Sequence, residues 1–291
     1  MTRIDALPAV FITGASSGIG LACAERLSAG GFRVLAGVRD AAGEARVAER
    51  TRGRATAVPL EVTDAASLAR AAATAAACGG EGGLAGFVGC AGTARWGPLE
   101  VLPPALLRRE LEVNVVGTLA ATQAFLPLLR LGRGRVVWIG SASGRCALPY
   151  TGAYAAGKAA LEGLADALRL ELRPWSIPVT LVEAGRIDTP LWRKVAAGIT
   201  ELRHLLSPSA AALYAPAFDA AGRGAGRGGG LAPDAVAAAV ARALTERRPP
   251  ARYVVGRDAE WQLLLGRLPA VLRDRALLRR MPGGPRGSVR G

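Results

Sequence analysis

Short apolar segments rich in β-branched residues recur along this chain, and they alternate with longer stretches whose apolar positions follow a helical period. The short segments that we interpret as strands are Ala9–Thr13, Arg33–Val38, Thr56–Leu60, Gly86–Gly89, Arg135–Gly140, Pro178–Glu183 and Arg252–Val255. Strands that alternate with helices pair in parallel and are covered by helices on both faces. The pattern therefore predicts an α/β fold with a doubly wound, parallel, seven-stranded sheet.

The rest of the chain adds two segments to this predicted sheet. No Pro/Gly-rich linker divides the sequence, so we expect a single domain over residues 1–291. Residues 190–230 contain a largely apolar stretch and then the low-complexity run Ala221–Gly230, which is predicted to be a mobile loop. Residues 260–291 are predicted to form a helical extension and tail, with one apolar helix over Glu260–Met281.

Composition favours a folded, soluble protein in a reducing compartment. Hydrophobic residues make up 51% of the chain and the mean hydropathy is +0.25. The longest uncharged run, Ala6–Ala24, is interrupted by a turn, and no signal-peptide pattern precedes it. The four cysteines lack metal-binding spacing, so we expect no metal site and a cytoplasmic location; they are Cys23, Cys78, Cys90 and Cys146.

The formal net charge of +14 comes almost entirely from arginine. Of the 37 Lys and Arg residues, only Lys158 and Lys194 are lysines. The arginines are spread along the chain without an aromatic-interleaved basic module, which favours solvated protein faces. We therefore expect no nucleic-acid partner.

A glycine-rich motif, T-G-A-S-S-G-I-G, covers Thr13–Gly20 directly after the first predicted strand. Gly14 permits a tight turn, Gly18 lets the backbone approach a phosphate, and Gly20 lets helix and strand pack closely. The N-terminus of the following helix supplies free N–H groups and a positive dipole. The motif indicates a pyrophosphate site, with an ordinary Gly-rich turn as the alternative for an isolated match.

Tyr154 and Lys158 stand four residues apart in Y-A-A-G-K, one helical turn apart on the same face. An ammonium group near a phenol favours the phenolate, and we expect it to lower the pKa of Tyr154. Tyr154 is then a candidate general acid/base for a carbonyl/alcohol pair. Without the other motifs, a surface pair would be the better interpretation of this spacing.

Taken together, the motifs resemble those of the classical short-chain dehydrogenase/reductases. Besides the glycine loop they include Asn114 in L-E-V-N-V-V-G, Ser141 in I-G-S-A-S-G, and Tyr154 thirteen residues after that serine. The resemblance runs from about Pro8 to Asp258 and implies a Rossmann fold with a nicotinamide cofactor. It implies that Ser141 binds the substrate oxygen, with Ser143 as the rival serine, and that Asn114 connects Lys158 to solvent through water.

The resemblance also implies which residues bind the cofactor. They are Gly14, Ser16, Ser17, Gly18, Ile19, Gly20, Arg39, Glu61, Val62, Ala91, Gly92, Asn114, Tyr154, Lys158, Gly185, Ile187 and Thr189. NADP(H) is expected in preference to NAD(H), because Val38 stands where NAD-preferring members carry an acidic residue, and Arg39 follows it. One alternative stays open: Asp40 pairs with Arg39 or reaches the ribose itself.

The sequence departs from the family pattern in three segments. Gly89-Cys90-Ala91-Gly92 replaces Asn-Asn-Ala-Gly and loses two amides that brace the sheet, Ala184-Gly185 replaces Pro-Gly, and Glu61 replaces the adenine-contacting Asp. We interpret Cys90 as a buried small residue, with a reactive thiol as the minor alternative. His204, the only histidine, is interpreted as a solvated or packing residue.

The substrate and the assembly are predicted in outline. Residues 190–230 correspond to the family's substrate lid, and their apolar character suits a hydrophobic alcohol or ketone. Arg252–Ala259 and the helix after it are similar to family members acting on steroids, retinoids or related lipids. We expect that helix to pack on the sheet or on another subunit, with peripheral membrane contact as the less favoured alternative.

Two further expectations concern assembly and the class of function. By resemblance, helices over Pro103–Leu131 and Thr151–Leu172 pair across a two-fold axis in a homo-oligomer, a dimer or a tetramer. The favoured function is an NADP(H)-dependent oxidoreductase of a hydrophobic secondary alcohol and ketone, or of an alcohol and aldehyde. The alternative is a non-catalytic dinucleotide-binding regulator with a basic surface.

Overall fold

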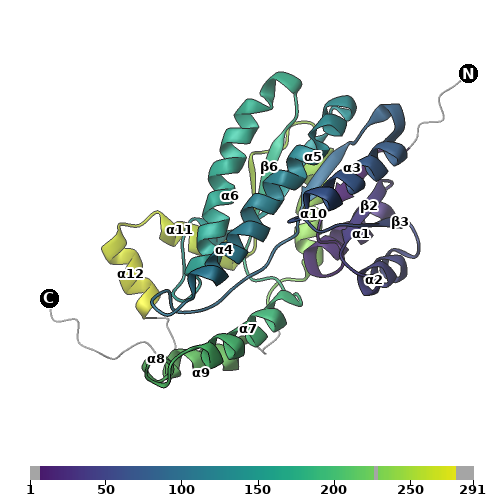
Figure 1. Ribbon diagram of the computed structural model, residues 1–291. Coiled ribbons are helices and arrows are strands. Elements are labelled where there is room, and N and C mark those ends of the chain that lie inside the picture. The colour runs from purple at the N-terminus through teal and green to yellow at the C-terminus, as the bar shows by residue number, and fades with distance from the viewer. Residues whose placement is uncertain (1–6, 226–228, 280–291) are drawn as a thin grey trace, which may run out of the picture.

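The fold is built on a single parallel sheet (Figure 1). The computed structural model describes residues 7–225 and 229–279. Its seven strands follow the order β3-β2-β1-β4-β5-β6-β7. Their bounds are β1 Ala9–Ile12, β2 Arg33–Val38, β3 Ala55–Pro59, β4 Gly86–Gly89, β5 Arg135–Ser141, β6 Val179–Ala184 and β7 Arg252–Val255. The fold predicted from the sequence is confirmed, and each strand end lies within one residue of its predicted position.

Helices cover both faces of the sheet. One face carries α3 (Ala65–Gly79), α4 (Pro104–Leu111), α5 (Gly117–Gly132) and α6 (Gly152–Glu171). The other face carries α1 (Gly18–Ala29), α2 (Ala41–Thr51) and α10 (Pro233–Thr245). The segment that corresponds to the lid forms α7 (Leu191–Leu205), α8 (Pro208–Leu213) and α9 (Ala215–Ala225), and α11 (Arg257–Gly266) and α12 (Ala270–Leu278) follow β7.

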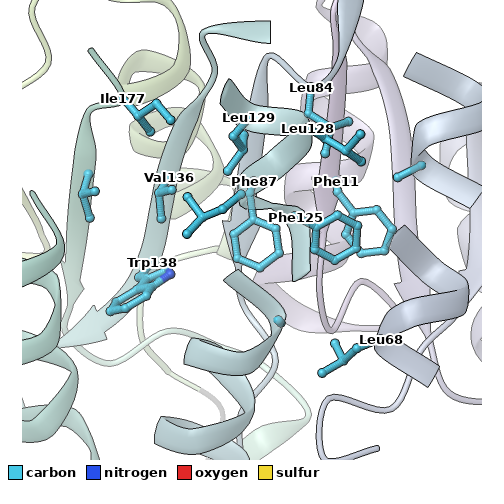
Figure 2. Close-up of a cluster of buried hydrophobic side chains, with 14 of the residues drawn as sticks. Phe11, Leu68, Leu84, Phe87, Phe125, Leu128, Leu129, Val136, Trp138 and Ile177 are labelled. Carbon is cyan, nitrogen blue, oxygen red and sulfur yellow. The ribbon is translucent and has the colours of Figure 1, made fainter. Parts of the chain in front are cut away.

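The two layers of helices create two apolar cores, because successive strand residues point to opposite faces of a sheet. On one face Phe11 of β1 and Phe87 of β4 meet Phe125 of α5, with ring centroids 4.2 and 5.4 Å apart (Figure 2). On the other face their neighbours Ile12 and Val88 pack against α1 and α10. Burial on both faces explains why these strands are continuous apolar runs instead of alternating ones.

The strand order reverses at β1, which pairs with β2 on one side and with β4 on the other. In open parallel sheets the loops at the carboxyl ends of the strands separate at such a point and leave a crevice for a ligand. The glycine loop follows β1, and Cys90–Gly92 follows β4. The topology therefore brings the predicted cofactor loops to one end of the sheet.

Helices α4 and α5 join into one helical segment through a π-helical turn, Glu112–Val116, which contains Asn114. Such turns commonly occur at functional sites. The joined segment, Pro104–Gly132, is also the described helix that is long and apolar enough to cross a membrane by length and composition alone. Its Phe125 and Leu129 are completely buried in the core, so packing against the sheet accounts for that composition.

Two predicted elements differ from the structure. Part of the predicted mobile loop Ala221–Gly230 belongs to helix α9, which continues to Ala225 because its alanines favour a helix more than its glycines oppose one; residues 226–228 lie outside the described residues. The single helix predicted over Glu260–Met281 is divided into α11 and α12. Pro269 causes the break, since proline disfavours helix at the residue before it. Residues 280–291 lie outside the described residues.

Candidate active site

A cleft of about 990 Å³ lies at the carboxyl ends of the strands. The predicted cofactor-binding residues that line it are Gly14, Ser16, Ser17, Gly18, Ile19, Gly20, Arg39, Glu61, Val62, Ala91, Gly92, Tyr154, Lys158, Gly185, Ile187 and Thr189. Asn114 and Ser141 are buried beside the cleft and do not belong to its lining. The roles of all these residues in binding and catalysis stay predictions. The fold nevertheless brings them to one cleft, as its lining or directly beside it.

The glycine loop adopts a backbone that only glycine suits at two positions. Gly14 and Gly18 have φ angles of +65° and +55°. A Cβ atom at Gly14 would lie 2.7 Å from Cα of Ala91, in the loop after β4. A Cβ atom at Gly20 would lie 2.3 Å from the carbonyl oxygen of Gly14. These close approaches keep the loop tight against both β4 and the start of α1.

The loop also leaves the first turn of α1 available to an anion. Ser17 is the N-cap residue of α1, yet its side chain forms no capping hydrogen bond. Thr13 Oγ1 accepts hydrogen bonds from the backbone N–H groups of Cys90 and Ala91, both 3.0 Å long, and so fixes the opposite wall. Uncapped N–H groups at a helix N-terminus bind phosphate. The residues present therefore fit the diphosphate of a dinucleotide.

Tyr154 and Lys158 lie on α6 and face the end of β5. Lys158 Nζ donates a 2.7 Å hydrogen bond to the carbonyl oxygen of Ile139 and lies 5.7 Å from the centre of the Tyr154 ring. Ser141 lies close enough to the Tyr154 hydroxyl to lower the pKa of that group. The rival serine, Ser143, instead receives a 3.4 Å hydrogen bond from Gln262 of α11. The geometry thus brings Ser141, Tyr154 and Lys158 together, as the sequence predicts.

Burial controls the protonation of this pair. It raises the pKa of Tyr154 from its usual value, and the hydrogen bond from Ser141 opposes that shift only in part. Burial also lowers the pKa of Lys158. The expectation that the ammonium lowers the pKa of Tyr154 is therefore wrong, because loss of solvation is the largest influence on that pKa and raises it. Tyr154 is held as a phenol, the form that donates a proton.

Asn114 braces the loop after β4. Its Oδ1 accepts a 2.7 Å hydrogen bond from the backbone N–H of Thr93, and its Nδ2 donates to the Thr93 carbonyl oxygen at 3.0 Å. Nδ2 also donates a 2.8 Å hydrogen bond to Glu110 Oε1. The predicted water-mediated connection from Lys158 to solvent stays a prediction. Sequence reasoning missed Glu110, because a carboxylate on a helix is normally solvated.

At the end of β2 the structure resolves part of the alternative left open for Asp40. Asp40 Oδ1 caps α2 by accepting a 2.6 Å hydrogen bond from the N–H of Gly43. Its other neighbour is Arg46, at 4.0 Å. Within the described part of the chain, no hydrogen bond or ion pair engages the guanidinium of Arg39. Asp40 therefore does not pair with Arg39, which lines the cleft as an available cation.

The loop after β6 shows why glycine is required at Gly185. A Cβ atom there would lie 2.3 Å from Oδ1 of Asp258, at the start of α11. The same carboxylate accepts a 2.5 Å hydrogen bond from the backbone N–H of Arg186 through Oδ2. Asp258 thus fixes the segment that carries Ile187 and Thr189. No local sequence pattern indicates this contact, because its partners are separated by more than 70 residues.

Three other residues singled out in the sequence are Glu61, Cys90 and His204, and the structure shows the surroundings of each. Glu61 accepts hydrogen bonds from the N–H and hydroxyl of Thr63, at 3.2 and 3.0 Å, and so closes the turn after β3. Burial raises the pKa of Cys90 to about 12, which keeps its thiol protonated and argues against a reactive thiolate. His204 lines a separate hollow of about 830 Å³ between the lid helices.

The far end of the cleft is formed by the lid. A cluster of apolar side chains joins it to the rest of the protein; its buried members are Leu102, Ala153, Val195, Ile199, Leu202 and Phe218. The cleft wall at this end also carries Trp96, Trp192 and two charged groups that the sequence did not indicate, Arg95 and Glu201, which lie 4.0 Å apart. Among the described residues, no group of His, Cys, Asp and Glu is arranged to hold a metal ion.

Comparison with known proteins agrees with this arrangement. The sequence pattern of the family described as short chain dehydrogenase matches residues 8–199, which hold the glycine loop, Asn114, Ser141, Tyr154 and Lys158. The chain belongs to the short chain dehydrogenase family. This short chain dehydrogenase is 38% identical over 196 residues to 17-beta-hydroxysteroid dehydrogenase type 1 of Homo sapiens, covering 64% of this chain and 58% of the human one.

Two other relatives extend the likeness over more of the chain. Retinol dehydrogenase 5 of Mus musculus is 35% identical over 278 residues, which cover 92% of this chain and 87% of the mouse protein. A crystal structure of a short chain dehydrogenase from Burkholderia cenocepacia, solved in complex with NADP, superposes with a TM-score of 0.72 at 26% identity and covers 94% of this chain and 98% of that one. The chain thus spans less than two thirds of the human steroid dehydrogenase but nearly all of the other two proteins.

Proposed function

We propose that this short chain dehydrogenase is an NADP(H)-dependent oxidoreductase that interconverts a hydrophobic secondary alcohol and its ketone, or an alcohol and its aldehyde. One observation carries the proposal. Tyr154 and Lys158 line the same cleft as the glycine loop, and Ser141 is buried beside that cleft, close enough to Tyr154 to affect its ionisation. A protein that only senses a dinucleotide needs the loop but not the proton donor.

In the proposed reaction the cofactor transfers the hydride and residues of the chain transfer the proton. The cofactor, when bound, supplies or accepts the hydride. Ser141 orients the substrate oxygen beside Tyr154, which gives it a proton during reduction and takes a proton during oxidation. Lys158, held by the Ile139 carbonyl, places a positive charge near the phenolate that is left after proton transfer. The lid limits access of water to this end of the cleft.

Two guanidinium groups support the preference for NADP(H). Arg39 lines the cleft without an intramolecular partner among the described residues, and Arg46 donates a 2.9 Å hydrogen bond to the Ser16 carbonyl in the glycine loop. Arg39 at the end of β2 and Arg46 of α2 thus both lie near the edge where a ribose 2′-phosphate would lie. Guanidinium groups bind phosphate in two-pronged geometry. The NADP bound to the Burkholderia cenocepacia protein is consistent with this preference.

The cleft favours an apolar substrate that has a polar end. Trp96, Trp192 and Val195 form an apolar wall. Steroid and retinol, named in the human and mouse relatives, are hydrophobic alcohols of the kind that such a wall accepts. We propose this class for the present chain, without choosing among its members.

For assembly and location we propose a homo-oligomer in the cytoplasm. The outer face of α6 presents small residues at helical spacing, among them Ala156, Ala159, Gly163 and Ala167. Small side chains let two helices approach closely, which suits a homo-oligomer formed around α6. The four cysteines are free, which suits the reducing conditions of the cytoplasm that we propose as the location.

The decisive experiment is an activity screen with the purified protein. Steroid, retinoid and aliphatic alcohols and ketones would be tested with NADPH, NADH and their oxidised forms, beside the Tyr154→Phe variant. We expect turnover of at least one hydrophobic substrate, faster with NADP(H), and none in the variant. Binding of NADPH, measured by fluorescence, without turnover of any substrate would contradict the proposal and favour the non-catalytic regulator.

A further inference from the structure

Helix α4 carries a buried carboxylate that the catalytic scheme does not use. All residues of α4 are described, and Glu110 is the one among them that is buried, with 2% of its surface exposed. Burying an ionisable group is unfavourable unless hydrogen bonds or charges compensate. A fully buried glutamate on an otherwise half-exposed helix therefore calls for a specific partner.

Glu110 finds its partners in the loop and helix that border the active site. Oε1 accepts a 2.8 Å hydrogen bond from Asn114 Nδ2, and Oε2 accepts a 2.7 Å hydrogen bond from Thr93 Oγ1. Asn114 in turn holds the backbone of Thr93 at both its N–H and its carbonyl. Glu110 thus fixes which way the Asn114 amide points, because only Nδ2 can donate to a carboxylate.

The carboxylate also lies within electrostatic reach of the catalytic pair. Asn114 packs directly on α6, since a Cβ atom at Gly157 would lie 3.7 Å from Asn114 Nδ2. The charged and titratable groups that interact electrostatically with Glu110 are Lys158 and Tyr154 of α6 and Arg95 of the loop after β4. Lys158 follows Gly157 on α6, and the charge of Glu110 acts on its ammonium.

We propose that Glu110 is a positioning residue of the reaction, which locks the Asn114 amide and places a negative charge behind the Tyr154–Lys158 pair. This role rests on the proposed oxidoreductase function and extends it to a residue outside the catalytic set. The negative charge of Glu110 favours the protonated form of Lys158, although burial disfavours it. The same charge favours the phenol form of Tyr154 until the charge of a bound substrate or cofactor changes the pKa of Tyr154.

The protonation tendencies agree with this geometry. The charge of Glu110 raises the pKa of both Tyr154 and Lys158. Burial raises the pKa of Glu110 itself, while its hydrogen bond with Thr93 and the charge of Arg95 act in the opposite direction. The three groups are therefore electrostatically linked, and removing one charge must move the titration of the others.

The small number of lysines and tyrosines in the chain simplifies a direct test by NMR. Lys158 and Lys194 are the two lysines and there are four tyrosines. Labelling with ¹³C-lysine and ¹³C-tyrosine gives few NMR signals, which Lys194→Arg and Tyr154→Phe assign. In Glu110→Gln, which keeps the shape and can keep the hydrogen bonds, we expect Lys158 and Tyr154 to titrate about 0.5 to 1 pH unit lower than in the wild type.

Glu171→Gln, which removes an exposed carboxylate at the end of α6, is the matched control and should leave both titrations unchanged. A second readout needs no variant at position 110. In the wild type, the Lys158 signal should show an additional small inflection in acid, where Glu110 takes up its proton. Unchanged titration of both residues in a folded Glu110→Gln protein, or a wild-type signal without that inflection, would overturn the proposal.

Kinetics separate this proposal from the proposed function. If the wild type oxidises an alcohol, the acidic limb of its pH–rate profile should move to lower pH in Glu110→Gln by the same amount as the Tyr154 titration. If no substrate is turned over but both NMR titrations move, the oxidoreductase assignment fails while the electrostatic link stands. If turnover is found but neither titration nor pH profile moves, Glu110 has only a structural role and the proposal is wrong.

Discussion

The indole ring of Trp138 occupies the space that a side chain at Gly89 would need. The two residues pair across β4 and β5, and a Cβ atom at Gly89 would lie 2.8 Å from Trp138 Cδ1. Trp138 is completely buried in the apolar cluster (Figure 2). Its Nε1 donates a 3.0 Å hydrogen bond to Thr122 of α5. A tryptophan on β5 thus links sheet and helix where the family pattern has an asparagine on β4.

This pairing predicts that Gly89 and Trp138 are coupled in stability. Gly89→Asn should lower the free energy of unfolding by about 1 to 3 kcal/mol, because the new side chain collides with the indole. Trp138→Val should cost about 3 kcal/mol through the cavity it leaves. The double variant should lose less than the sum, since each change relieves the other. Urea unfolding of the four proteins measures the cycle, and strictly additive losses would contradict the coupling.

The Gly89–Trp138 contact also shows where sequence reasoning stops. The strands were predictable because burial on both faces requires continuous apolar runs. Tyr154 and Lys158 could be placed beside each other because their spacing lies within one helical turn. The contacts of Gly89 with Trp138, of Gly185 with Asp258, and of Glu110 with Thr93 join different segments of the chain, so no local pattern reveals them.

The errors in the sequence prediction have two physical causes, local helix propensity and burial. The run after Ala221 contains enough glycine to suggest a loop, yet alanine and the preceding helical turns extend α9 to Ala225. The pKa of Tyr154 was expected to fall because a lysine is near. The size of the opposing desolvation depends on how deeply both groups are buried, which only the folded structure gives.

Tyr154→Phe should abolish turnover and spare cofactor binding, because the variant loses only the hydroxyl that carries the proton. In the wild type the raised pKa of Tyr154 keeps the phenol protonated through neutral pH, so carbonyl reduction should hold its rate there and fall in alkali, whereas alcohol oxidation should rise with pH. Steady-state kinetics over a pH series measure both limbs. More than about a tenth of the wild-type kcat remaining in the variant, a loss under ~1.4 kcal/mol, would exclude Tyr154 as the acid/base.

Lys158→Ala provides the contrasting case. Lys158 lines the cleft and contacts Ile139, so its removal should weaken cofactor binding as well as turnover. Fluorescence titration with NADPH separates the two effects. If Lys158→Ala bound the cofactor as tightly as Tyr154→Phe does, the lysine would act on proton transfer alone.

Arg39→Ala should raise KM for NADPH strongly and leave KM for NADH nearly unchanged. The guanidinium has no intramolecular partner among the described residues, so its removal should cost little stability, and the loss should fall on the ligand that carries the extra phosphate. The control is Arg50→Ala, which removes an exposed arginine of α2 that pairs with Glu25 of α1. A wild type that prefers NADH, or equal effects on both cofactors, would refute the assignment.

Gly163 offers a test of self-association that leaves the monomer intact. It lies on the outer face of α6, and a Cβ atom there would meet no atom within 4 Å, so a large side chain fits the isolated subunit. In a dimer that packs α6 against its symmetry mate, Gly163→Trp places a bulky ring near the two-fold axis and should shift the protein to the monomeric mass. Gly79→Trp, at the end of α3, has the same open surroundings and should leave the mass unchanged.

Light scattering after size-exclusion chromatography at micromolar concentration distinguishes the outcomes. A monomeric wild type would contradict self-association itself, whereas an oligomer that tolerates Gly163→Trp would mean that the subunits meet through another face.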